Sequence, residues 1–246
     1  MKTIYISIIF LFILTACNSP KLKYCENEYL LIHHEELKPI TLDFEQNEAD
    51  LEKQLLEQLE VNLICSSSKM VGFPLDLKTD NFHKSFGSVT IPAMFFNNCP
   101  KEENIPIRYK SLNKHAVFSV NADSISLNGK TLIAEKDSII KALEKHWIEQ
   151  ELTYNDFKKF ESRLYLSLDL PSNNNLIKIV IDSYTRFYLK KLDEYTRKAF
   201  DEYLCDINTE TFKLWKEELN FLIHVCYTDD CILLRQPPAP PKVIEK

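Results

Sequence analysis

Apolar and polar residues recur with recognisable periods along the first half of the chain. Asn47 can cap a helix in which leucines fall four residues apart, a spacing that turns one apolar face to a core: Leu51, Leu55, Leu59 and Leu63. Apolar or alternating runs predict strands at residues 29–32, 40–44, 73–77 and 89–96. The first half is therefore expected to form a small unit of helix and sheet.

The second half opens with a hairpin signal. Two alternating runs, 124–127 and 130–133, flank Asn128-Gly129, a dipeptide that accepts the positive φ angles of a type I′ turn. Residues 136–150 then carry an apolar stripe at helical spacing, formed by Ile139, Ile140, Leu143 and Trp147. A further helix is expected over 153–162.

The remaining pattern predicts another hairpin and two more helices. Residues 164–170 alternate without a fault, and a second apolar run over 176–181 follows the turn residues 171–175, so these runs are expected to pair. Residues 182–185 offer N-caps to a helix with the buried stripe Leu192, Tyr195, Ala199, Phe200 and Tyr203. A last helix is expected over 209–224.

The order of these elements predicts an α+β fold made of two small αβ units. The N-terminal unit spans 28–97 and the C-terminal unit spans 113–235, where two β-hairpins are expected to pack on amphipathic helices. Residues 98–112 are polar, contain two prolines, and are interpreted as the linker. The segment 236–246 is a Pro-rich tail of polyproline type, which could lie on a partner.

The first sixteen residues have the pattern of a signal peptide. Lys2 precedes an apolar run over 4–14, and small residues follow it. Eleven residues make a helix of roughly 16 Å, about half the hydrocarbon thickness that a membrane-spanning helix must cross. The ending Leu14-Thr15-Ala16-Cys17 resembles the lipobox of bacterial lipoproteins, which implies that Cys17 is lipidated and becomes the mature N-terminus. A plain signal peptide with an incidental Cys17 is the alternative.

Lipidation at Cys17 would hold the protein at a membrane surface. Residues 17–27 are then a short lipidated tether. Asn18 follows the cysteine in place of the Asp that some bacteria read as an inner-membrane retention mark, which favours the outer membrane. The expected location is the cell membrane or the outer membrane, lipid-anchored and facing the periplasm.

The composition argues against two classes of ligand, nucleotide cofactors and nucleic acids. With 3 glycines in 246 residues the chain has neither a GxGxxG motif nor a P-loop, so no nucleotide cofactor is expected. The net charge of −6, with both signs interspersed, gives no basic stripe for nucleic acid. No cofactor is assigned.

Six cysteines remain beside Cys17, three before residue 100 and three after it. In an exported chain they can form disulfides, and fifteen complete pairings are open. If the halves fold separately, this split leaves a thiol unpaired in each half or forces a bridge between them. Cys226 and Cys231 could close a small loop, whereas a metal site there lacks visible further ligands.

The tetrad over residues 33–36, two histidines followed by two glutamates, contains metal-ligand types. Neighbouring residues of a strand point to opposite faces, so the tetrad cannot converge on one ion without a bend. A solvated strand end is the preferred interpretation, and no metal site is assigned.

Residues 115–240 are similar to the periplasmic domain of the ExbD/TolR biopolymer-transport family. The similarity rests on a strand, the hairpin around Asn128-Gly129, a helix, the run 176–181 ending at Asp182, and an aromatic-rich helix. It implies that Asp182 is the family's Asp after a strand, that Phe187 or Tyr188 is its helix-opening aromatic, and that Asp182 and Tyr188 contribute to binding. The family's membrane helix with an ionisable Asp has no counterpart here, so a proton-driven role is not implied.

Two functions follow from these features. The first is a non-enzymatic, membrane-anchored envelope lipoprotein that binds an envelope protein or peptidoglycan through its soluble module; a structural or immunity-type lipoprotein is a variant of it. The alternative is an envelope hydrolase with a site near Asp182 and His224, joined by His115 and a thiol, for which the spacing shows no assembled nucleophile and base.

Overall fold

The structure is a computed structural model, which describes residues 25–60, 70–75, 89–96, 114–155, 164–219 and 221–227. Helices and a mixed sheet of seven strands confirm the α+β class within these residues. The predicted signal peptide, the tether up to residue 24, the linker 98–112 and the tail 236–246 lie outside the described residues, and so does Leu63.

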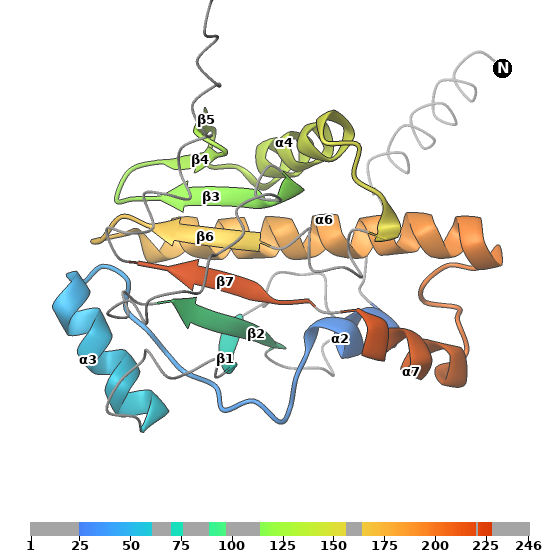
Figure 1. Cartoon of the computed structure of the whole chain (residues 1–246), viewed down its shortest axis with the longest axis horizontal. Coiled ribbons are helices and arrows are strands. Elements are labelled where there is room, and N and C mark those ends of the chain that lie inside the picture. The colour runs from blue at the N-terminus through green and yellow to red at the C-terminus, as the bar shows by residue number, and fades with distance from the viewer. Residues whose placement is uncertain are drawn as a thin grey trace, which may run out of the picture.

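One sheet runs through the fold in the order β1-β2-β7-β6-β3-β4-β5 (Figure 1). Its strands are β1 Val71–Leu75, β2 Val89–Phe96, β3 Ala116–Val120, β4 Ile125–Leu127, β5 Lys130–Leu132, β6 Leu164–Leu168 and β7 Ile223–Cys226. Strands β2, β7, β6 and β3 are parallel, and antiparallel strands flank them at both edges. Because β2 pairs with β7, the two predicted units share one sheet and one hydrophobic core.

Helix α2 spans Glu26–Ile32, so the strand predicted over 29–32 is wrong. The Glu28 carboxylate accepts a hydrogen bond from the Cys25 backbone N–H at 2.8 Å, which closes the first helical turn. Tyr29 and Ile32 then lie one turn apart and face the core. Residues 40–44 are irregular instead of a strand, and Pro39 bridges to Gly72 of β1 beside them.

Helix α3 spans Glu48–Leu59 and confirms the helix predicted after Asn47. The Asn47 side chain accepts a hydrogen bond from the Asp50 N–H at 3.0 Å, as an N-cap should. Leu51, Leu55 and Leu59 are buried.

The β4–β5 hairpin and helix α4, Lys136–Glu149, are also confirmed. Asn128 and Gly129 have φ angles of 48° and 79°, the positive pair that a type I′ turn requires. Ile139 and Leu143 face the core from α4. Of the helix predicted over 153–162, residues 156–162 lie outside the described residues.

Helix α6, Asn174–Phe200, absorbs the run that was predicted to be the second strand of a hairpin. The Asn173 side chain caps it by accepting hydrogen bonds from the Asn175 and Leu176 N–H groups. Ile177, Val180 and Ile181 are buried at helical spacing. The second hairpin is therefore wrong, and Asp182 lies inside a helix and not after a strand.

The predicted helix over 209–224 divides into a helix and a strand. Helix α7 spans Thr209–Glu218, and β7 begins at Ile223. His224 therefore lies in a strand, and its expected position at a helix end is wrong. The spacing of apolar residues cannot distinguish a strand of four residues from a turn of helix. Residues 223–226 form a strand because they pair with β2 on one side and β6 on the other.

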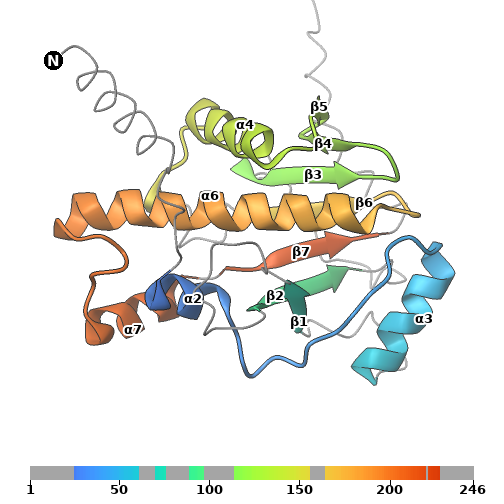
Figure 2. The same cartoon turned by 180° about the vertical axis from the view of Figure 1, so that it is seen from behind.

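Helix α6 lies across one face of the sheet, in front of it in Figure 2, and α4 packs beside α6. Helices α2 and α7 lie together at one end of the fold, whereas α3 lies at the opposite end in both views (Figures 1 and 2).

Candidate functional site

Asp182 belongs to an ion cluster between α4 and α6. Its Oδ2 lies 2.5 Å from Lys136 Nζ at the start of α4, and its Oδ1 accepts a hydrogen bond from Arg186 Nε at 3.1 Å. The residue is 4% exposed. Because both carboxylate oxygens are engaged by cations, this arrangement stabilises the packing of two helices.

Tyr188 lies in an aromatic cluster under the same helix. Its ring meets Phe221 edge-on with 4.9 Å between centroids, and the Tyr184 ring lies one turn away. Burial raises the pKa of the Tyr188 phenol well above its ordinary value. The structure thus buries both residues carried over from the ExbD/TolR resemblance, which leaves neither side chain exposed to a partner.

His115 and His224 lie on the other face of the sheet, where both rings contact Tyr165 on the strand between them. The Tyr165 ring stacks on His224 at 4.7 Å and lies 4.9 Å from His115, measured between centroids. Ala116 lines the cavity under α4 and α6 and pairs with Leu164 of β6. Because successive side chains of a strand point to opposite faces, His115 before Ala116 and Tyr165 after Leu164 point away from those helices.

This placement contradicts the hydrolase site predicted near Asp182 and His224. Asp182 lies on the side of α4 and α6, His224 lies on the opposite face, and the sheet separates them. Cys226, the thiol expected beside His224, is disulfide-bonded. Its predicted partner Cys231 lies outside the described residues.

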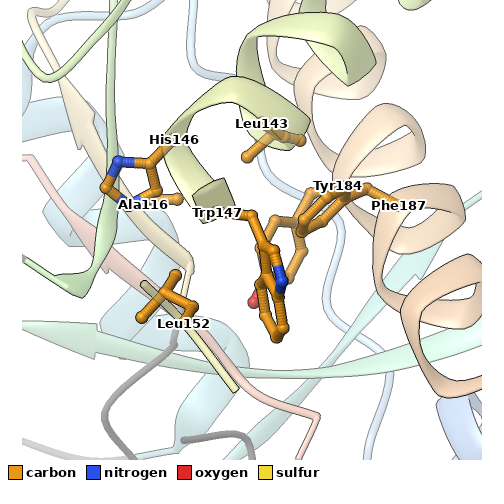
Figure 3. Close-up of a pocket in the computed structure, with 7 residues that line it drawn as sticks. All are labelled: Ala116, Leu143, His146, Trp147, Leu152, Tyr184 and Phe187. Atoms are coloured by element: carbon orange, nitrogen blue, oxygen red, sulfur yellow. The ribbon is translucent and has the colours of Figure 1, made fainter. Parts of the chain in front are cut away.

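The cavity between β3, α4 and α6 is too small for a substrate (Figure 3). Its volume is about 10 Å³, room for about one water molecule. Its lining is mostly apolar: Ala116, Leu143, His146, Trp147, Leu152, Tyr184 and Phe187.

His146 is held neutral at the rim of this cavity. The Asn128 amide accepts a hydrogen bond from the Val117 N–H with its Oδ1, so its Nδ2 points at His146 Nδ1 from 3.2 Å. The other ring nitrogen, Nε2, donates to the Lys114 carbonyl at 3.3 Å. Burial lowers the pKa of His146. The geometry therefore fixes the neutral tautomer that carries its proton on Nε2.

The histidines at 33 and 34 do not converge on a common ion. His33 Nδ1 accepts a hydrogen bond from the Thr90 N–H at 2.9 Å, and the His33 ring stacks on Tyr29. His34 Nδ1 pairs with Glu36 at 2.9 Å. Each imidazole therefore serves a separate local contact.

A group of two sulfur atoms and one carboxyl joins the start of α2 to the turn after α6. Cys25 at the start of α2 and Cys205 in the turn after α6 form a disulfide across 180 positions of sequence. An oxygen of the Glu28 carboxylate lies within 4.8 Å of both sulfur atoms. We refer to Cys25, Glu28 and Cys205 as the sulfur–carboxyl site.

Glu28 has an unusual protonation equilibrium for an acid. Burial raises its pKa, the hydrogen bond from the Cys25 N–H opposes the rise, and the nearby Asp193 charge adds to it, which brings the pKa to about 7. No local pattern in the sequence marks Glu28 as a candidate. The signal that could have led to this site is the distribution of the cysteines, three in each half of the chain. It allowed a disulfide between the halves but did not identify the residues that form it.

Comparison of the chain with protein-family models, with curated proteins and with solved structures finds no match. Among the described residues, no helix has both the length and the apolar character needed to cross a membrane.

Proposed function

We propose that this chain is a lipid-anchored protein of the bacterial cell envelope whose module binds an envelope protein or peptidoglycan without catalysing a reaction. The observation that carries the proposal is the disulfide between Cys25 and Cys205. Such bonds persist in oxidising compartments outside the cytosol, which is the side of the membrane to which a lipobox sequence delivers its protein.

The position of this disulfide also supports an orientation. Cys25 follows Cys17 by eight positions (25 − 17), so the chain between them reaches at most about 29 Å. Lipid on Cys17 would therefore keep α2, and with it α7 and the turn that carries Cys205, close to the bilayer. Helix α3 lies at the opposite end of the fold and would face a partner away from the membrane (Figure 1).

The element order supports a binding module. From β3 onward it runs strand, hairpin, helix, strand, two helices and a final strand. This succession keeps the hairpin, helix, strand and helix order on which the ExbD/TolR resemblance rests, but β6 takes the place of the run 176–181 and Asp182 lies inside the helix. Binding of protein or peptidoglycan by the soluble module is the part of that resemblance that we carry over.

The anchor is tested by metabolic labelling with a fatty acid, followed by fractionation of the envelope. The wild type should incorporate label and sediment with membranes, whereas Cys17→Ala should lose the label. Label retained in Cys17→Ala would overturn the anchor. A Cys25→Ser variant is the matched control because it removes a cysteine that the lipobox does not include.

Partner binding is tested by placing a photo-crosslinking residue at Lys53 on the exposed face of α3 and, separately, at Leu214 on α7. We expect Lys53 adducts to contain a protein or muramidase-sensitive glycan, and Leu214 adducts to contain lipid. Recovery of the chain alone from both positions in intact cells would contradict the proposal.

A further inference from the structure

The sulfur–carboxyl site contains the parts that thiol–disulfide exchange requires. Cys205 is exposed and Cys25 is half-buried, so an incoming thiolate reaches the Cys205 sulfur first. The Glu28 carboxyl group lies within 4.8 Å of the Cys25 sulfur, which would then leave. An attackable sulfur, a leaving sulfur and a proton-carrying group therefore lie together.

Hydrogen bonds that do not involve sulfur hold the same segments together. The Asn27 Nδ2 donates to the carbonyls of Leu204 and Ile207 at 2.9 and 3.0 Å. The Asp193 Oδ1 accepts a hydrogen bond from the Leu204 N–H at 2.9 Å. After the disulfide opens, the two Asn27 bonds would still tie α2 to the turn, and the Asp193 bond would still tie the turn to α6. Both sulfurs would therefore stay in place for the bond to re-form.

The charges around Glu28 fit the role of a proton donor near neutral pH. Asp193 faces it from α6, Cys25 contacts it from the start of its own helix, and Cys205 faces it from the turn. Burial and the Asp193 charge favour the neutral acid and bring its pKa to about 7. Both protonation states are therefore populated near neutrality, as a group that gives and regains a proton needs.

We propose that the Cys25–Cys205 disulfide exchanges with the dithiol of a partner protein in the envelope, and that Glu28 protonates the departing Cys25 sulfur. The exchange is stoichiometric, with one partner dithiol oxidised for each Cys25–Cys205 disulfide reduced, so it goes beyond the proposed non-enzymatic binding without contradicting it. It does not require the lipid on Cys17.

The reaction balances in two steps. A partner thiolate attacks the Cys205 sulfur and forms a mixed disulfide, and the Cys25 sulfur leaves with the electron pair of the broken bond and takes the Glu28 proton. The second partner thiolate attacks the partner's own sulfur in the mixed disulfide, which releases Cys205 as a thiolate that takes a proton from water. The partner dithiol is oxidised to a disulfide, Cys25 and Cys205 are reduced to thiols, and Glu28 recovers its proton from solvent.

The test measures opening of the disulfide by dithiothreitol in the folded full chain, followed by alkylation and mass spectrometry of the Cys205 peptide. Each rate constant is divided by the thiolate fraction of the reagent, so that the remaining pH dependence belongs to the protein. In the wild type this corrected rate constant should fall about tenfold between about pH 6 and pH 8, because the protonated fraction of an acid with pKa near 7 falls by that factor.

Three variants separate the proton donor from a merely structural acid. Glu28→Gln should be slower at low pH with a flat profile, and its amide oxygen can still accept the Cys25 N–H. Asp193→Asn should move the fall to lower pH, because it removes a charge that raises the pKa of Glu28. Glu26→Gln, at an exposed position of the same helix, should keep the wild-type profile.

Cys226 gives an internal comparison, since its disulfide opens in the same tube and should show no such fall. A flat wild-type profile, or a fall that persists in Glu28→Gln, would overturn the role of Glu28. Opening of the Cys25–Cys205 bond only at the rate of global unfolding would overturn exchange altogether and identify the bond as a structural crosslink.

Discussion

Lys136 and Asp182 form an ion pair, with 2.5 Å between Nζ and Oδ2, that ties the first turn of α4 to α6. The Asp182 side chain is almost fully enclosed, whereas the Lys136 side chain is about a third exposed. Arg186 supplies the second cation from the next turn of α6. A buried carboxylate is costly unless cations lie beside it. Lys136 and Arg186 supply these cations, and the Lys136 ion pair fixes the position of α4 relative to α6.

Asp182→Asn should lower the free energy of unfolding by about 1–3 kcal/mol, because it leaves two cations facing a neutral amide. Chemical denaturation followed by circular dichroism measures this loss. Glu210→Gln is the matched control: Glu210 pairs with Lys213 at 3.8 Å on the surface, and its loss should cost under about 0.5 kcal/mol. Equal effects of the two variants would show that the cluster contributes nothing special.

Position 72 requires glycine because the Thr90 side chain on the neighbouring strand leaves no room for a Cβ atom. A Cβ atom at Gly72 would lie 2.3 Å from Thr90 Cγ2 and 3.1 Å from the Lys38 carbonyl oxygen. Gly72→Ala should therefore destabilise the protein by about 1–3 kcal/mol through overpacking. Thermal unfolding of Gly72→Ala with Thr90→Ser, which removes Cγ2, should show part of the stability restored.

Gly129→Ala is the control for this rescue. Nothing lies within 4 Å of a Cβ there, but the φ of +79° is unfavourable for alanine, so a cost of about 1 kcal/mol is expected. Thr90→Ser should not reduce that cost. Rescue of both alanine variants by Thr90→Ser would mean that the serine stabilises the protein by another route.

Glu28 should make the protein less stable as the pH rises from about 4.5 to 7. Its pKa is higher in the folded state, so the folded state binds more protons in this interval and the stabilisation is lost as the acid ionises. Compared with Glu28→Gln, the wild type should lose on the order of 3 kcal/mol across the interval. Parallel stability curves for the two proteins would contradict the raised pKa.

His146 should have the opposite effect. Its folded-state pKa is lowered by burial, so the unfolded state takes up the proton first as the pH falls below about 6.5, and stability is lost there. The stability of the wild type relative to His146→Gln should therefore decline on acidification. Nitrogen NMR should also show the proton on Nε2 near neutral pH; a proton on Nδ1 would contradict the contact from Asn128.

Where a prediction needed only neighbouring residues, the sequence was sufficient. Asn47 caps α3 and Asn128-Gly129 closes the β4–β5 hairpin, because in both places the side chain or backbone acts within a few residues. The run 176–181 misled because its apolar residues fit a strand as well as a helix, and the cap at Asn173 that decides between them was not recognised.

The sequence by itself determined the helix capped by Asn47, the Asn-Gly hairpin and the signal-like pattern that ends at Cys17, since each depends on local geometry or on a contiguous composition. The insertion of β7 between β2 and β6, the pairing of Cys25 with Cys205 and the placement of Asp182 and His224 on opposite sides of the sheet were decided only by the tertiary structure. These relations join residues that are far apart along the chain, and the burial of one shared core selects them.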